Sequence, residues 1–245
     1  MSSARSIIEI SLILFAATIF RTTFGFGEAL IAVPLLSLLL PVKVAAPITV
    51  LASIVIALVA VIREREHIHI SSAKKLLLAT ICGLPFGLLL LRYVSEGATK
   101  GILGILILAF STFSILRPQF LVLANDRLIW VFGFLAGITG GSYGMNGPPL
   151  AIYGAARGWS PRQFRATIQA YFLPASILGM LGYYFTGFWT KEVSLIFASS
   201  SPSIVIGILC GNLLNQRIDK KTLFASHLFY GLILIACMLM LQAVF

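Results

Sequence analysis

Residues 135–161 read LAGITGGSYGMNGPPLAIYGAARGWSP, and this stretch decides the fold. It lies in an apolar region, yet it is rich in glycine and carries Pro148 and Pro149 in its middle. In a helix interior Gly costs about 1 kcal/mol and Pro about 3 kcal/mol, so one continuous helix is disfavoured here. In hydrocarbon, non-helical backbone persists only where protein buries it or where it lines a wet cavity. We therefore expect two half-helices, the second beginning near Asn146 with Pro148 in its first turn.

The second half-helix would direct its free N–H groups and its partial positive charge at the break. A helix N-terminus of this kind is suited to binding an anion. The pattern therefore predicts an anion site inside the membrane.

The first half of the chain contains a counterpart of this stretch. Residues 20–40 read FRTTFGFGEALIAVPLLSLLL, with apolar segments on both sides of Gly25-Phe26-Gly27. Paired interrupted segments at matching places in two halves are the best sequence pointer to the binding site of a transporter.

Composition places the chain in the membrane. Of its 245 residues, 59% are hydrophobic and only 11% are charged, whereas an average soluble domain has roughly 25% charged residues. The net charge of +10 would suggest nucleic acid in a soluble protein. Here the basic residues lie mostly in short loops between apolar runs, so we attribute the charge to membrane orientation and expect no nucleic-acid partner. Cys82, Cys210 and Cys237 fall inside apolar runs without paired spacing, and we interpret them as buried small hydrophobes.

Each half is predicted to hold one broken or re-entrant helical hairpin and three transmembrane helices. The expected spans are Lys43–Ile62, Lys74–Arg92, Ala98–Leu116, Pro161–Phe185, Glu192–Asn215 and Lys221–Val244. Gly83-x-x-x-Gly87 in the first half matches Gly207-x-x-x-Gly211 in the second, and both pairs indicate close helix packing. We therefore expect an all-α protein of two repeats, 1–120 and 121–245, that form one membrane domain.

The direction of the repeats depends on how the interrupted segments cross. If each crosses once, the repeats are parallel and the loop charges divide about evenly between the two sides. If each enters and returns, or crosses twice, then twelve of the 18 Lys and Arg collect on one side and five on the other. The positive-inside rule favours this second arrangement. We therefore predict inverted repeats with both termini outside the cytoplasm.

Arg21, the remaining basic residue, lies within the first hairpin, and Glu28 is the acidic residue well inside a predicted membrane segment. Arg21 has two interpretations. In the first, it snorkels to an interface or pairs with Glu28. In the second, it faces the cavity and binds an anion through the parallel N–H donors of its planar guanidinium. Glu28 either complements the dipole of the first-half half-helix or takes up a proton when an anion binds. The second alternative makes Glu28 the candidate for proton coupling.

The other candidate substrate-binding residues lie beside the two breaks or on the following span. They supply neutral hydrogen-bonding groups or let backbone N–H groups approach an oxyanion closely. Three of them are also suited to a structural role. Asn146 is equally suited to cap a helix. Tyr143 is suited to packing against neighbouring side chains, and Gln169 to hydrogen-bonding a neighbouring helix. The set is Thr22, Thr23, Gly25, Gly27, Ser142, Tyr143, Gly144, Asn146, Gly147 and Gln169.

The two motifs together resemble those of a known family. Gly25-Phe26-Gly27 with Pro34-Leu35, and Gly140-Gly141 with Pro149-Leu150, are similar to the motifs of the TauE/SafE family of sulfite exporters. The resemblance covers nearly the whole chain in length, two-half layout and both motifs. It implies a secondary transporter of a sulfur oxyanion or small organosulfonate, such as sulfite.

The functional hypothesis is therefore a secondary anion transporter of the inner (cytoplasmic) membrane that works by alternating access with Glu28-linked proton coupling. An anion channel and a transporter of a small carboxylate are the alternatives. We expect no enzyme, cofactor or metal site, because His67-x-His69 has no third ligand in view and no nucleophile lies near a base. A homodimer is left open.

Overall fold

The computed structural model describes residues 4–63, 70–116, 127–217 and 223–244. These residues form helices and no strand, which confirms the all-α prediction. The helices are α1 (Ala4–Phe24), α2 (Glu28–Ser37), α3 (Val42–Arg63), α4 (Ile70–Tyr93), α5 (Glu96–Leu116), α6 (Leu128–Tyr143), α7 (Gly147–Ala156), α8 (Pro161–Thr186), α9 (Lys191–Arg217) and α10 (Leu223–Val244). The expected boundary between the repeats falls in 117–126, outside the described residues.

Both interrupted segments form hairpins of a longer helix and a short one. α1 ends at Phe24 and α2 begins at Glu28, while α6 ends at Tyr143 and α7 begins at Gly147. The predicted start of the second half-helix is therefore confirmed to within one residue. At ten residues each, α2 and α7 extend about 15 Å, half the thickness of the hydrocarbon core. Neither short helix can cross the membrane alone.

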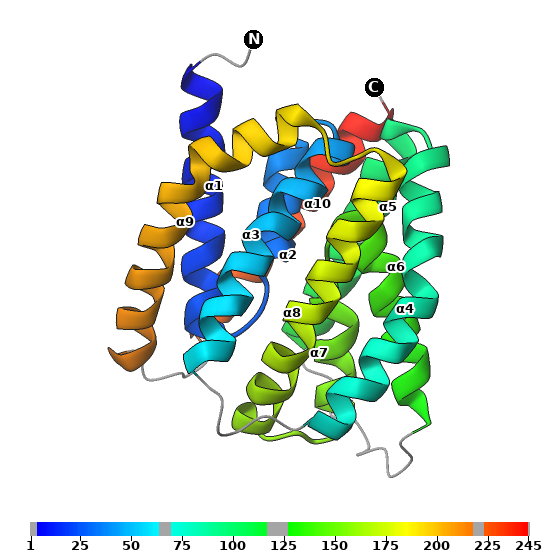
Figure 1. Ribbon diagram of the computed structural model, residues 1–245, viewed down its shortest axis with the longest axis vertical. Coiled ribbons are helices and arrows are strands. Elements are labelled where there is room, and N and C mark those ends of the chain that lie inside the picture. The colour runs from blue at the N-terminus through cyan, green and yellow to red at the C-terminus, as the bar shows by residue number, and fades with distance from the viewer. Residues whose placement is uncertain (1–3, 64–69, 117–126, 218–222, 245) are drawn as a thin grey trace.

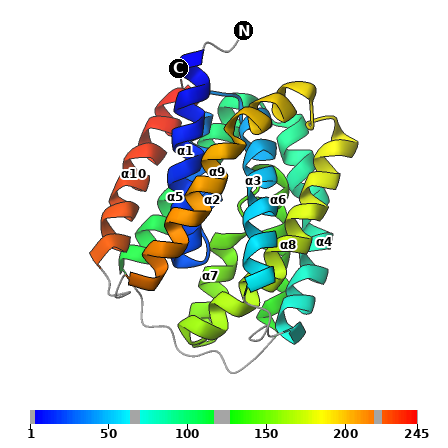
Figure 2. The same ribbon diagram turned by 60° about the vertical axis from the view of Figure 1, so that its left-hand side comes forward.

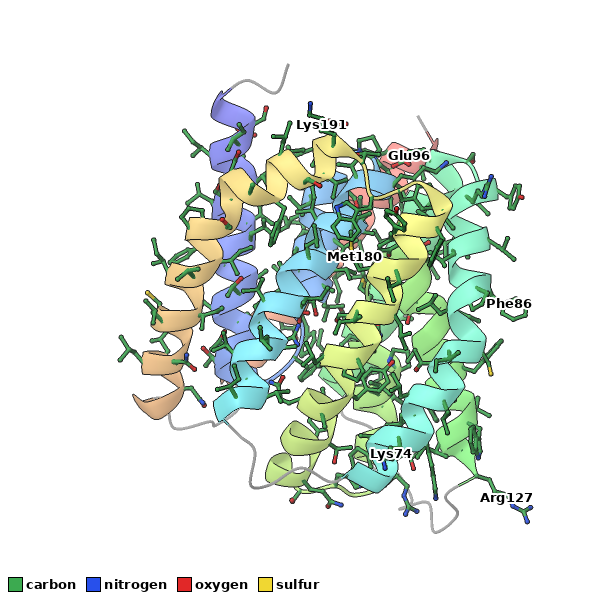
Figure 3. All side chains as sticks on the ribbon, viewed as in Figure 1. Lys74, Phe86, Glu96, Arg127, Met180 and Lys191 are labelled. Carbon is green, nitrogen blue, oxygen red and sulfur yellow. The ribbon has the colours of Figure 1, made fainter. Side chains whose placement is uncertain are left out.

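Helices at the same place in the two halves run in opposite directions. Both chain termini lie at one end of the bundle (Figure 1), where Glu96 begins α5 and Lys191 begins α9 (Figure 3). Lys74 in the first turns of α4 and Arg127 before α6 lie at the opposite end (Figure 3). Thus α1 and α6 start at opposite ends, and so do α4 and α9. Inverted repeats require this arrangement.

The two halves interlock rather than pack as separate blocks. The most extensive helix contacts join α4 to α6, α1 to α9, and α5 to α10, and each of these pairs takes one helix from each half. Figure 2 shows α1 beside α9 and α10 beside α5. The buried apolar side chains form two clusters, and each cluster contains residues of both halves.

Glycines allow the equivalent pairs α4–α6 and α1–α9 to approach closely. A Cβ added at Gly83 or Gly87 of α4 would lie 2.1 Å from a backbone oxygen of α6. A Cβ added at Gly207 or Gly211 of α9 would lie 3.1 or 2.9 Å from a backbone oxygen of α1. The two Gly-x-x-x-Gly motifs therefore serve helix packing, as the sequence predicted.

The outer surface is apolar, as a lipid-facing surface must be. Within the described ranges, five helices are long and apolar enough to cross a membrane. Large hydrophobic side chains such as Phe86 on α4 are exposed and point outward (Figure 3). Cys82 and Cys237 also lie on this surface. The interpretation of these two cysteines as buried was wrong, because an apolar run in a membrane protein has a lipid-facing side as well as a core-facing side.

Replacing Gly87 by Leu should separate α4 from α6. The new Cβ would lie 2.1 Å from the Ile138 carbonyl oxygen, which is backbone and cannot rotate away. Overpacking of this kind costs about 1–3 kcal/mol, so we expect a lower unfolding temperature in detergent. Gly231→Ala is the matched control, since nothing lies within 4 Å of a Cβ added at Gly231. Equal unfolding temperatures for the two variants would contradict the packing described.

Candidate functional site

The two breaks meet at one small cavity between the halves. Its lining comes from the start of α2, the start of α7 and the α6–α7 break, with one aromatic ring from α8. The lining residues are Gly27, Glu28, Ala29, Leu30, Gly144, Met145, Asn146, Gly147, Pro148 and Phe172. Of the candidate site residues, Gly27, Glu28, Gly144, Asn146 and Gly147 are therefore brought together as the sequence analysis expected.

Glycine makes each break possible. Gly27 precedes α2 with φ of 100°, and Gly144 ends α6 with φ of 66°, both in the left-handed region that favours glycine. The chain can therefore leave one helix and begin the next within three residues. The cavity wall includes Glu28, Ala29 and Leu30 of the first turn of α2, whose N–H groups have no intrahelical partner. The first turn of α7 offers fewer donors, because Pro148 and Pro149 have no N–H.

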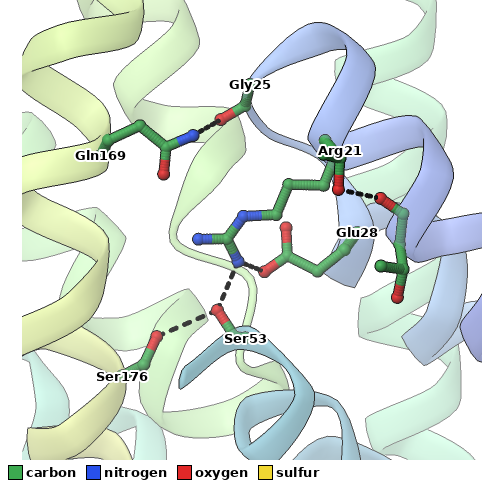
Figure 4. A network of polar contacts seen from close by, with 8 residues as sticks. Arg21, Gly25, Glu28, Ser53, Gln169 and Ser176 are labelled. Atoms are coloured by element: carbon green, nitrogen blue, oxygen red, sulfur yellow. Dashed lines mark hydrogen bonds and ion pairs between the residues drawn. The ribbon is translucent and has the colours of Figure 1, made fainter. Parts of the chain in front are cut away.

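Arg21 lies on α1, one turn before the first break, and is fully buried. Its Nη1 forms an ion pair with Glu28 Oε1 and also donates to Ser53 Oγ at 2.6 Å (Figure 4). Its guanidinium carbon lies 4.6 Å from the centre of the Phe172 ring, a cation–π contact. Within the first interpretation of Arg21, the pairing with Glu28 is present and snorkelling is not. The second interpretation, that Arg21 faces the cavity and holds an anion, stays a prediction.

The other edge of the Arg21 guanidinium, formed by Nε and Nη2, makes no hydrogen bond or ion pair of this kind with the described part of the chain. Nε and Nη2 are buried and have no hydrogen-bond partner among the described residues. In Figure 4 the free Nη2 points away from Glu28, toward the helix that carries Gln169 and Ser176. A buried donor without a partner costs about 1–3 kcal/mol and is rare in native proteins, so this edge is a candidate ligand-binding edge.

Gln169 connects α8 to the first break. Its Nε2 donates to the Gly25 carbonyl at 3.2 Å, while its buried Oε1 has no partner within the described part of the chain (Figure 4). Two turns further along α8, Ser176 bonds Ser53 at 3.0 Å, and Ser53 in turn accepts from Arg21. Gln169 therefore both bonds a neighbouring segment and leaves a polar atom near the site.

Asn146 holds the second break to its surroundings. It stands at the N-cap of α7, but its side chain makes no capping hydrogen bond. Instead its Nδ2 donates to the Tyr171 hydroxyl at 3.1 Å, and that hydroxyl is 2.7 Å from Thr80 Oγ1 of α4. The capping role considered for Asn146 is therefore not the one observed, and the residue stays at the cavity wall.

Four candidate residues direct their hydroxyls away from the cavity. Thr22 and Thr23 donate to Thr18 and Ile19 carbonyls in their own helix, and Ser142 donates to the Ile138 carbonyl. The Tyr143 hydroxyl donates to the Thr99 carbonyl of α5 at 3.0 Å, which is a packing role. Threonine and serine readily bond the carbonyl one turn back when they lie within a helix, so closeness to a break in the sequence did not place these groups in the site.

Phe172, Tyr171 and Thr80 belong to the network and were missed by the sequence analysis. Phe172 lies three residues after Gln169 and so shares its helical face, which is a signal that could have identified it. No sequence signal identifies Thr80, because its role depends on the packing of α4 against α8.

The charged groups belong to one half only. Three residues separate α1 from α2, and three separate α6 from α7. Counted from these breaks, Arg21 corresponds to Gly140 and Glu28 corresponds to Gly147. Gly140 is needed because the Asn146 side chain fills that space, and its Oδ1 would lie 2.3 Å from an added Cβ. The first break therefore carries the ion pair and the second a neutral amide.

No group of three His, Cys, Asp or Glu that could hold a metal occurs among the residues described. His67 and His69 fall outside those residues.

Comparison with known proteins agrees with this architecture. The family model described as sulfite exporter TauE/SafE matches residues 10–240. The probable sulfite/organosulfonate exporter TauE of Cupriavidus necator is 26% identical over 202 residues, which cover 80% of this chain and 79% of that protein. No solved structure matches. The match spans both hairpins and nearly the whole bundle, so this chain is a member of the TauE/SafE sulfite exporter family.

Proposed function

We propose that the protein carries a sulfur oxyanion or small organosulfonate across the cytoplasmic membrane by alternating access. The observation that carries the proposal is a cavity lined by the first residues of both α2 and α7, in which Glu28 forms part of the wall and holds the buried Arg21 in an ion pair. The name of the Cupriavidus necator relative supports the sulfur-containing substrate. The residues around the cavity, taken by themselves, support only a negatively charged substrate.

The electrostatics of the cavity favour an anion. Each half-helix N-terminus contributes a partial charge of about +0.5. The charges of Arg21 and Glu28 offset each other, and Arg21 keeps two donors on one edge that have no partner among the described residues. Such an edge binds two oxygens of a sulfonate or sulfite with parallel hydrogen bonds. Within the bilayer these interactions are weakly screened, so their contribution to binding is large.

The cavity is too small for this substrate as it stands. Its volume of about 10 Å³ is room for about one water molecule. The lining must therefore separate before an anion enters. Because the lining comes from the start of α2 on one hairpin and from the break and start of α7 on the other, a movement of one hairpin relative to the other would open the cavity to either side in turn.

We also propose an orientation, based on inverted repeats. Lys74 and Arg127 lie at one end of the bundle (Figure 3), and both belong to the group of twelve Lys and Arg that the sequence analysis expects on one side. We assign this side to the cytoplasm by the positive-inside rule.

Fusions after Phe245 test the orientation. Because the C-terminus lies at the end opposite Lys74 and Arg127, alkaline phosphatase placed there should be active and green fluorescent protein should be dark. When the same two reporters are fused within residues 117–126 instead, alkaline phosphatase should be inactive and green fluorescent protein should fluoresce. A fluorescent C-terminal fusion would contradict the assignment.

Flux in liposomes tests the substrate class. With purified protein, we expect saturable efflux of sulfite, thiosulfate or sulfoacetate and weaker efflux of oxalate, because the name of the relative indicates a sulfur-containing substrate. Current without saturation would favour an anion channel, and preference for oxalate a carboxylate transporter. Flux of a cation and of none of these anions would refute the proposal.

The same assay tests Arg21. Arg21→Lys keeps the charge but loses the planar fork, so flux at low substrate should fall about 10- to 100-fold, the equivalent of one or two charge-assisted hydrogen bonds. Arg92→Lys is the matched control, since Arg92 is exposed at the end of α4. Equal losses in the two variants would show that Arg21 has no special role.

Glu28 is proposed to take up a proton when a doubly charged anion binds. Thiosulfate efflux should then rise as the pH falls from about 8 to about 6, because protonation removes a negative charge beside the substrate. In Glu28→Gln this dependence should be absent. Glu192→Gln, on an exposed first-turn carboxylate of α9, should behave like the unaltered chain. Full pH dependence in Glu28→Gln would exclude Glu28 as the proton acceptor.

A further inference from the structure

We infer that the site selects anions by charge: a monoanion binds the Nε–Nη2 edge of Arg21 while Glu28 stays ionised, and a dianion binds only together with a proton on Glu28. This inference rests on the proposed function and adds to it the charge state of the substrate.

The geometry separates the two edges of Arg21. Glu28 and Ser53 both bond Nη1, whereas Nε and Nη2, which form one side of the guanidinium, have no partner among the described residues. Those two N–H groups are parallel and match two oxygens of a sulfonate or hydrogensulfite. An anion can therefore bind Arg21 without displacing Glu28, so binding does not require the ion pair to break.

The charges then set the preferred substrate. Arg21 and Glu28 cancel, which leaves the two half-helix N-termini with about +0.5 each, a total near one positive charge. A monoanion is balanced by this total. A dianion leaves one negative charge uncompensated in a buried site, which is strongly unfavourable. Protonation of Glu28 removes that excess and restores the balance.

Neutral groups make up the rest of the described surroundings of the pair. Ser53 comes from α3, Asn146 from α7, and Gln169, Phe172 and Ser176 from α8. Other titratable groups on the described parts of the helices packed against α2 stand in the first two turns of α1, α3 and α5, on α7, or on the exposed face of α10. These are Glu9, Lys43, Glu96, Lys100, Tyr153, Tyr230 and Cys237. Tyr153 is fully buried and packs against Trp159. Glu96 accepts from the Val42 N–H and Lys100 donates to Gln242, so Glu28 is left as the group that can adjust the charge of the site.

Two anions of similar size and fixed charge test the inference on the unaltered chain. Methanesulfonate is a monoanion and sulfate a dianion throughout the neutral range. Calorimetric titration of the purified protein should give a methanesulfonate affinity that changes less than about threefold between pH 6 and 8. The sulfate affinity should increase up to about tenfold for each unit the pH falls, as uptake of one proton per ion requires.

Glu28→Gln supplies the matched variant, with Glu192→Gln as its control and elution volume and circular dichroism as checks on folding. In Glu28→Gln, sulfate should bind with no pH dependence and at least as tightly as methanesulfonate. Equal pH slopes for the two anions on the unaltered chain, or sulfate binding as tight as methanesulfonate at pH 8, would overturn the charge rule while leaving anion binding intact. Binding of neither anion at any pH, together with no flux of sulfite, would instead remove the proposed function.

Discussion

The structure depends on keeping one buried positive charge stable inside an apolar bundle. Arg21 has no exposed surface, and an isolated charge at membrane depth is too costly to persist without compensation. Glu28 compensates it across the first break, and Ser53 and the Phe172 ring hold the guanidinium from two other helices. The pair can form only because the chain reverses at Gly25-Phe26-Gly27 and brings the start of α2 back to the end of α1. The glycine break is therefore what allows the buried charge to be compensated.

The asymmetry between the halves follows from this constraint. Two Arg–Glu pairs facing one cavity would double the number of buried charges, each with its own cost of desolvation. The second half instead places Gly140 and Gly147 at the corresponding positions and fills the space with Asn146, a neutral group bonded to Tyr171. The charged pair at the breaks therefore comes from the first half, and the second half contributes neutral groups.

Features that depend on local chemistry could be predicted from the sequence. Glycine and proline placed both breaks within about one residue, because their backbone preferences act over a single turn. Arg21 and Glu28 were identified because charged residues are rare within membrane segments. What could not be predicted was the direction of short polar side chains: Thr23 and Ser142 lie beside the breaks but bond their own helices. The contributions of Phe172 and Thr80 depend on which helices meet, and that information is distributed over the whole bundle.

The contacts of α8 explain how two breaks on separate hairpins can act as one site. Gln169 bonds the Gly25 carbonyl at the first break, Tyr171 bonds Asn146 at the second, and Phe172 lies against Arg21 between them. Three nearby residues of one helix therefore contact both breaks. Any motion that widens the cavity must either carry α8 with one hairpin or break its bonds to the other. Since α8 also packs on α3 and α4 of the first half, its position is fixed by both halves, and its hydrogen bonds join the two hairpins at their breaks.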